Sequence, residues 1–259
     1  MGILANLVKQ QPTSVLETLD TAQDFKSGGN FILESDVYPV KIKDAYGILS
    51  KGGALGIRLI LGYGDNYDKE YREDIYISNK EKKFTYVDSE TKKEKPLPGY
   101  SLMNDICGIT VGSNLATVAE NTVEQMKKVY DYTTKSDINE SHETYVDLID
   151  QILIAGIVKN EETKKEFGSD GKLYSTDKTR FTNRIHTVFT ADTHNTLYEL
   201  DHAEGDDAPE AKAYESFIKV FKGKTIDRKD KGTNVGTTAA NSTSSKEGTV
   251  TRRSLRRNA

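Results

Sequence analysis

The chain has 259 residues, of which 36 are basic and 40 acidic, so its formal net charge is -4 at neutral pH. This length fits one elaborated domain or two small ones, and a single cysteine excludes an internal disulfide framework and a multi-cysteine zinc site. The longest apolar run, residues 152–158, is far shorter than the roughly 18 residues of a membrane helix, and the first residues lack the features of a secretion signal.

Charge is distributed unevenly along the chain. Residues 229–259 contain seven basic and two acidic residues, a net charge of +5, so residues 1–228 carry -9. Residues 232–248 are mostly Gly, Thr, Asn, Ala and Ser, which bury too little apolar surface to offset the entropy of ordering. We therefore predict an N-terminal peripheral segment at 1–30, a folded domain at 31–228, and a flexible linker with a basic tail at 229–259.

The first half of the folded part reads as strands followed by a helix. Leu102, Ile106 and Ile109 recur at helical spacing between Pro98 and Gly112, which predicts a helix there. Alternation of apolar and polar residues predicts four strands before it, at residues 37–43, 55–61, 74–78 and 84–87.

The second half reads as further strands and a last helix. Strand-like segments lie at about residues 128–132, 148–159 and 180–190, and a helix is predicted over 211–221 before Gly223. Three strands, a helix and further strands follow one another in the five-stranded Greek-key barrel called the OB-fold. The expected fold is therefore mainly β or α+β: an elaborated OB-like Greek-key barrel with peripheral helices and a disordered C-terminal tail. Another mixed antiparallel α+β domain would give a similar order.

The residues that most often carry catalysis do not form a recognisable constellation. His186, His194 and His202 are eight residues apart, not at the three- or four-residue spacing that places two metal ligands on one helix face. Cys107 lies on the apolar side of the predicted helix, where a small buried thiol is the common outcome. We therefore expect no enzymatic activity, no metal and no cofactor.

Aromatic and basic residues are interleaved between residues 38 and 100, which contain eight of the fourteen tyrosines. Nucleic-acid bases stack on rings while ammonium and guanidinium groups contact phosphates, so this mixture favours a single-strand binder. Tyrosine is also a good strand residue, and some rings will simply pack. The expected stacking residues are Tyr63, Tyr67, Tyr71, Tyr76, Phe84 and Tyr86, and the expected phosphate contacts are Lys41, Lys43, Arg58, Arg72, Lys80, Lys82 and Lys83.

The expected placement of these residues follows from the same alternation. Tyr76 and Arg58 should face away from their apolar neighbours, as should Lys41 and Lys43. In contrast, Tyr63, Tyr67 and Tyr71 fall in a glycine-flanked, polar stretch that we interpret as a mobile loop beside the barrel.

Five segments together suggest a family: Tyr38-Pro39-Val40-Lys41-Ile42, residues 51–57, residues 74–79, Phe84-Thr85-Tyr86 and residues 97–102. As a set they resemble the single-stranded-DNA-binding proteins of tailed bacteriophages, especially those of lytic podoviruses. The resemblance covers about residues 30–225. It implies an OB-type core that coats single-stranded DNA during phage replication and recombination in the host cytoplasm, without enzymatic activity and without a membrane.

The C-terminal tail departs from the pattern of such proteins. Single-strand binders commonly end in an acidic tail that recruits replication proteins, whereas this chain ends in a basic cluster. In one branch of the resembled family the C-terminal region activates host RNA polymerase at late promoters. The resemblance thus makes Arg252, Arg253, Arg256 and Arg257 candidates for a polymerase contact; a basic tail could instead add phosphate affinity or have no native role.

A function of another class stays open at this point. The tyrosine-rich strands could form a protein interface in a virion or scaffold protein, because aromatic residues are enriched in such interfaces. Loss of DNA affinity in a folded Tyr76→Ala variant would favour DNA binding, and loss of an oligomer with intact DNA affinity would favour the scaffold.

Overall fold

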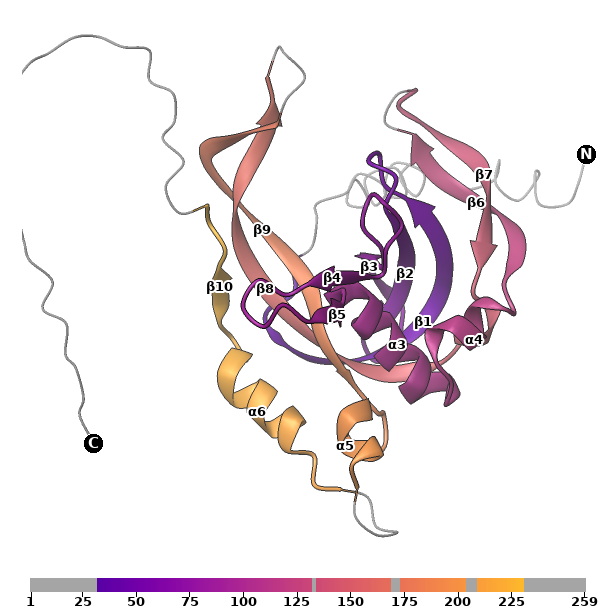
Figure 1. Cartoon of the computed structure of the whole chain (residues 1–259), viewed down its shortest axis with the longest axis vertical. Coiled ribbons are helices and arrows are strands. Elements are labelled where there is room, and N and C mark those ends of the chain that lie inside the picture. Colours follow the sequence, from indigo (N-terminus) through magenta and orange to yellow (C-terminus); the bar gives the residue numbers. More distant parts are fainter. Residues whose placement is uncertain (1–31, 132–133, 169–172, 204–208, 231–259) are drawn as a thin grey trace, which may run out of the picture.

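The computed structural model describes residues 32–131, 134–168, 173–203 and 209–230. This part of the chain is mainly β, with one large sheet and a few helices (Figure 1). The predicted N-terminal segment at 1–30 and the tail beyond residue 230 lie outside the described residues.

Five long strands form the centre of the large sheet. Each of the five is antiparallel to its neighbours, and a short sixth strand runs parallel to the middle of one of them. In spatial order the five are β3 (Lys69–Tyr76), β2 (Leu55–Tyr63), β1 (Asp36–Leu49), β8 (Ile152–Phe167) and β9 (Leu173–Phe189), and the short strand is β10 (Thr225–Asp227).

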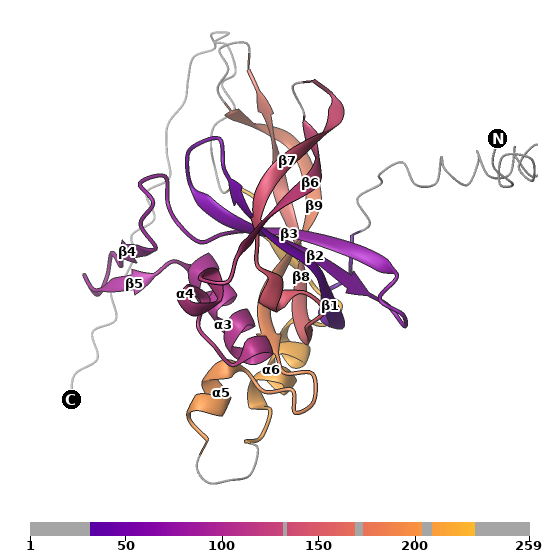
Figure 2. The ribbon, with the colours of Figure 1, turned by 90° about the vertical axis from the view of Figure 1, so that its right-hand side faces the viewer.

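Two hairpins extend from this centre. The strands β6 (Val123–Asp131) and β7 (Ser136–Thr144) pair with each other, and β7 meets β1 where Tyr46 lies opposite Thr144. The strands β4 (Thr85–Val87) and β5 (Glu94–Pro96) form a separate two-stranded sheet. Figure 2 shows this small sheet standing out from the body of the molecule.

The helices connect the strands and cover parts of the sheet. Helix α3 (Pro98–Val111) starts with a proline at its first position and ends at Gly112, whose φ of 70° is a left-handed conformation that glycine adopts without strain. The predicted helix therefore has the expected bounds. The remaining helices are α4 (Leu115–Ala119), the short 3-10 helix Val146–Leu148, α5 (Leu197–Asp201) and α6 (Lys212–Phe221).

The main core lies inside the curved sheet and is covered by α3. Strand β2 contributes alternate residues, Ile57, Leu59 and Leu61, all of which are buried. Helix α3 adds Met103, Ile106 and Cys107, so the thiol is buried as predicted. A second cluster forms where α6 packs on the other side of β8 and β9, and it contains Ile154, Val158, Phe189 and Phe217.

The sheet does not close into a barrel. Among the described residues no backbone ladder joins β3 to β9, which are the two outer strands of the five. The Glu73 carboxylate of β3 lies near the backbone N–H of Ile185 in β9, which acts to lower the pKa of Glu73. The predicted mainly β fold is confirmed, but the predicted barrel is not, because a seam remains between β3 and β9.

The predicted loop containing three tyrosines is wrong. Tyr63 is the last residue of β2 and Tyr71 lies within β3, so of the three only Tyr67 is in the connection. Gly62 looked like a strand end but lies inside β2, opposite Glu70. A Cβ on Gly62 would come within 2.7 Å of the Tyr67 carbonyl oxygen, so the glycine permits the tight return of the chain rather than ending the strand.

Candidate nucleic-acid interface

The outer face of β1, β2 and β3 carries a row of polar and aromatic side chains. Because successive residues of a strand point to opposite faces, Arg58 lies outside while its neighbours Ile57 and Leu59 fill the core. Arg58 is opposite Tyr46 of β1 on one side and Asp74 of β3 on the other. The row therefore crosses three strands, and Arg58 points outward as predicted.

Arg58 is fixed in this row by a two-point ion pair. Its Nε lies 2.6 Å from Asp74 Oδ1, and its second guanidinium nitrogen lies 2.7 Å from Oδ2. The guanidinium carbon is 6.0 Å from the centre of the Tyr46 ring, within cation–π range. The ion pair raises the pKa of Arg58, so this cation is permanently charged and rigidly placed.

The β6–β7 hairpin extends the row. The Nζ atom of Lys127 lies 5.5 Å from the centre of the Tyr46 ring and 2.8 Å from the Asp44 carboxylate. The His142 ring is 5.0 Å from the same tyrosine, and its Nδ1 is hydrogen-bonded to the Gly47 carbonyl. Tyr46 is thereby buried under the hairpin, where it holds two cations in position but is not free to stack on a base.

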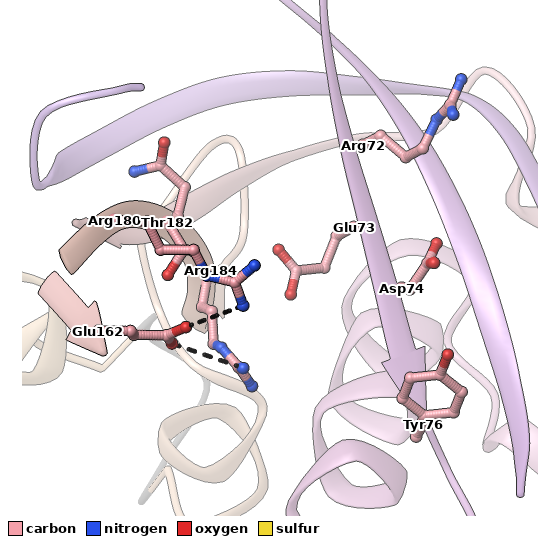
Figure 3. A pocket seen from close by; sticks show the side chains of 9 residues that line it. Arg72, Glu73, Asp74, Tyr76, Glu162, Arg180, Thr182 and Arg184 are labelled. Carbon is pink, nitrogen blue, oxygen red and sulfur yellow. Dashed lines mark ion pairs between the residues drawn. The ribbon is translucent and has the colours of Figure 1, made fainter. Parts of the chain in front are cut away.

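A groove lies on the outer surface above the seam (Figure 3). On the β3 side it is lined by Arg72, Asp74 and Tyr76, and the β9 side contributes Arg180, Thr182 and Arg184. Its volume is about 470 Å³. The same lining also includes the carboxylates of Glu73, Asp74 and Glu162. Tyr76 is 44% exposed at the edge of this hollow, in agreement with the prediction that its ring faces solvent.

The arginines of the groove are only weakly neutralised. Glu162 of β8 lies 3.5 Å from a guanidinium nitrogen of Arg180 and 3.7 Å from one of Arg184, so one carboxylate serves two cations. Arg72 has no ion-pair partner among the described residues. Phosphate oxygens are good acceptors for such guanidinium groups.

The groove continues into a second hollow of about 400 Å³ that shares Asp74, Tyr76 and Arg184 with the first. This hollow reaches the start of α3 at Pro98 and also contains Arg228, which follows β10. Together the two hollows form a path along the seam. Arg180 and Arg184 line it from β9, and Arg72, Asp74 and the half-exposed Tyr76 line it from β3.

Glu73 forms the bottom of this path. Figure 3 shows its carboxylate pointing from β3 across the groove toward the arginines of β9. Burial is the main influence on this group and raises its pKa to about 7, although Tyr71, Arg184 and the Ile185 backbone act in the opposite direction. Near neutral pH the carboxyl is therefore partly protonated, and it neutralises the surrounding arginines only in part.

The β4–β5 hairpin and the loop before it carry a separate set of predicted residues. Phe84 and Tyr86 are each 41% exposed, and the Phe84 ring lies 5.5 Å from the Tyr100 ring of α3. Lys80, Lys82 and Lys83 are exposed in the preceding loop, where Lys83 pairs with Glu81 at 3.2 Å.

The remaining predicted residues lie away from the seam. Tyr63 and Tyr67 line a separate hollow together with Tyr38. Tyr63 is also buried in the main core, and Tyr71 packs against the same core. Lys41 pairs with Asp150 at 2.8 Å and Lys43 with Glu70 at 3.2 Å, both on the surface. The tail residues Arg252, Arg253, Arg256 and Arg257 lie outside the described part of the chain.

Arg180, Arg184 and Arg228 were not predicted as site residues. They lie more than 100 residues from Arg72 in the sequence, so no local pattern connects them with the aromatic and basic residues of β3. A weak signal was present, because Arg180, Thr182 and Arg184 share one face of a strand by their alternate spacing.

The histidines pack against four different aromatic groups rather than meeting one another. His142 contacts Tyr46, His186 lies beside Phe217 and Phe221, His194 stacks on Tyr214, and His202 stacks on Tyr198. In the described residues, no three His, Cys, Asp or Glu side chains form a group that could hold a metal ion. Across those same residues, no helix has the length and apolar character needed to cross a bilayer.

Comparison with known proteins gives no relative for this chain: no family model matches it, and no curated protein sequence matches it significantly.

Proposed function

We propose that this protein binds single-stranded DNA without sequence preference and acts in phage DNA replication and recombination. The observation that carries the proposal is the groove along the seam, which the half-exposed Tyr76 lines on one side and Arg180 and Arg184 line on the other. One ring for stacking and several cations for phosphates are the elements that a single-strand site needs.

The order of the strands supports the same function. In spatial order the five central strands are β3, β2, β1, β8 and β9, and α3 lies between the third and the fourth of them in sequence. This order is compatible with the OB-like Greek key that we propose for the chain. In OB-folds the face of the second and third strands binds oligonucleotides. Arg58, Arg72 and Tyr76 occupy that face in this chain.

The proposal is tested with labelled single-stranded and duplex oligonucleotides in fluorescence-anisotropy titrations at several salt concentrations. If Arg58, Arg72 and Arg228 each neutralise one phosphate and Arg180 and Arg184 share one, the slope of log affinity against log salt should be about -2.8. Duplex DNA should bind more weakly, because its bases cannot stack on Tyr76. Absence of binding at low salt, or an affinity that does not respond to salt, would overturn the proposal.

A matched pair of tyrosine variants localises the site. Tyr76→Ala should weaken single-strand binding by roughly 5- to 160-fold, since one base–aromatic stack contributes about 1–3 kcal/mol. Tyr198→Ala is the control, because Tyr198 is 70% exposed on α5 and does not line the groove. Equal single-strand affinities of the two variants would show that Tyr76 is not part of the binding site.

A second function, as a virion or scaffold protein, is favoured by the β4–β5 hairpin. Phe84, Tyr86 and Val87 expose apolar surface on this small sheet, and Val87 is 67% exposed. Exposed apolar patches of this kind often contact another protein. If Tyr86→Ala abolished an oligomer while Tyr76→Ala left DNA affinity intact, the scaffold function would replace the first proposal.

A further inference from the structure

Two buried polar side chains beside the groove have no hydrogen-bond partner. Asn160 of β8 is fully buried, and neither its amide oxygen nor its amide nitrogen has a partner among the described residues. Thr182 of β9 lies opposite Asn160 in the sheet register, and its buried hydroxyl is likewise without a partner. Buried polar groups of folded proteins are nearly always hydrogen-bonded, so this pair points to a ligand that is absent from the structure.

The register places these groups between the two arginines. Arg184, Thr182 and Arg180 are alternate residues of β9, and they lie opposite Val158, Asn160 and Glu162 of β8. Paired residues of antiparallel strands point to the same face, so Thr182 and Asn160 share the face of both guanidinium groups. Thr182 itself lines the groove.

The charges around the pair leave room for an anion. The distances from Glu162 to Arg180 and Arg184 are 3.5 Å and 3.7 Å, longer than the 2.6 Å of the Arg58–Asp74 pair. The arginine side chains are 59% and 61% exposed, so they can turn toward a ligand. Two guanidinium groups, a hydroxyl and an amide N–H are the donors that a tetrahedral oxyanion accepts from.

We propose that Arg180, Thr182, Arg184 and Asn160 form one discrete phosphate site beside the seam. This inference rests on the proposed function, because the phosphate it would hold is a phosphodiester of the bound single strand. The guanidinium groups supply charge and the Thr182 hydroxyl and Asn160 amide supply neutral donors. Glu162 holds the arginines until the phosphate arrives, and it competes with the phosphate for them.

The experiment uses the full chain with substitutions that remove one donor at a time. Thr182→Val removes the hydroxyl at almost unchanged volume and should weaken single-strand binding about fivefold, because it deletes one hydrogen bond. Thr182→Ser keeps a hydroxyl and should restore the affinity. Thr179→Val is the matched control, because Thr179 is an exposed threonine of the same strand outside the groove.

Charge variants test the same site independently. Arg184→Gln should lower the affinity and reduce the magnitude of the salt slope by about 0.7, the value for one phosphate contact. Glu162→Gln should raise the affinity, since it removes the competing carboxylate. Glu166→Gln is its control, because Glu166 pairs with Lys164 at 2.8 Å further along the hairpin. Circular dichroism and thermal unfolding verify that each variant is folded.

A titration with inorganic phosphate is monitored through the NMR amide signals of residues 180–184. It distinguishes failure of the phosphate site from failure of the proposed function. If the protein binds the oligonucleotide but Thr182→Val behaves like Thr179→Val, the phosphate site is overturned and the proposed function stands. If it binds no oligonucleotide, yet phosphate shifts these signals only in the unsubstituted chain and in Thr182→Ser, the site takes a free phosphate and the proposed function fails. If neither ligand binds, both are overturned.

Discussion

The hydroxyl of Tyr71 donates a hydrogen bond to the carboxylate of Glu73, two residues further along the inner face of β3. The backbone N–H of Ile185 in β9 also acts on this carboxylate and lowers its pKa. Glu73 thus reaches from β3 toward β9, two strands that no backbone ladder joins among the described residues. Its hydrogen bond with Tyr71 fixes its position. Burial raises the pKa of both groups, that of Glu73 to about 7.

The stability of the fold should depend on pH through Glu73. Its ordinary pKa of 4.5 is raised to about 7 in the folded chain, so the folded state favours the protonated form. The free energy of unfolding should therefore fall by up to about 3 kcal/mol as pH rises from about 4.5 to 7. Above pH 7 this group should change the stability little. Denaturant titrations between pH 4.5 and 8.5 measure this change.

Glu73→Gln should flatten this dependence and make the protein more stable than the unsubstituted chain at pH 8. Glu70→Gln is the control, because Glu70 is exposed and pairs with Lys43 on the surface. If the free energy of unfolding of Glu73→Gln depended on pH as it does in the unsubstituted chain, Glu73 would not be the group responsible.

Gly99→Ala should destabilise the protein strongly. A Cβ at Gly99 would lie 2.1 Å from the Tyr76 carbonyl oxygen, so α3 would have to move away from the end of β3. We expect a loss of more than about 2 kcal/mol in the free energy of unfolding, measured by denaturant titration. Gly52→Ala, in an open turn, should change stability by much less. Similar losses in both variants would argue against this close contact.

Cys107 should not react with thiol reagents in the native protein. Its side chain is completely buried, and burial raises the pKa of its thiol to about 12, so almost no thiolate is present at pH 8. A colorimetric disulfide reagent should therefore modify the chain only after denaturation, with one equivalent per chain. Rapid modification of the folded protein would show that α3 opens readily.

The basic tail gives a prediction that concerns a second partner. If Arg252, Arg253, Arg256 and Arg257 contact host RNA polymerase, full-length protein should retain the purified polymerase in a pull-down, and a chain ending at Gly232 should not. Substituting the four arginines by glutamine in the full-length protein should have the same effect as the truncation. Equal recovery by all three proteins would exclude the tail as the contact.

Strong local periodicity made parts of the fold predictable from the sequence. The alternation around Arg58 predicted both the strand and the outward direction of the side chain, and the spacing of Leu102, Ile106 and Ile109 before Gly112 predicted α3. The prediction of a loop over the Tyr63–Tyr71 stretch was wrong because glycine is common in turns. Gly62 instead lies within a strand, where it allows the backbone of Tyr67 to come close.

The groove was harder to predict because it depends on long-range geometry. Arg72 and Tyr76 come from β3, but Arg180 and Arg184 come from a strand more than 100 residues later, and only the curvature of the sheet brings them to the same groove. Nothing in the local pattern near Glu73 indicates that its carboxylate would reach the backbone of Ile185.

The seam also affects whether copies of this protein aggregate at high local concentration. The outer edges of β3 and β9 face each other across the groove, and Arg72, Arg180 and Arg184 line the approach to both. Unpaired edges readily recruit strands from other molecules, and charged side chains along an edge oppose this. If the protein coats single-stranded DNA as proposed, these charges would let neighbouring molecules lie side by side without joining their sheets into an aggregate.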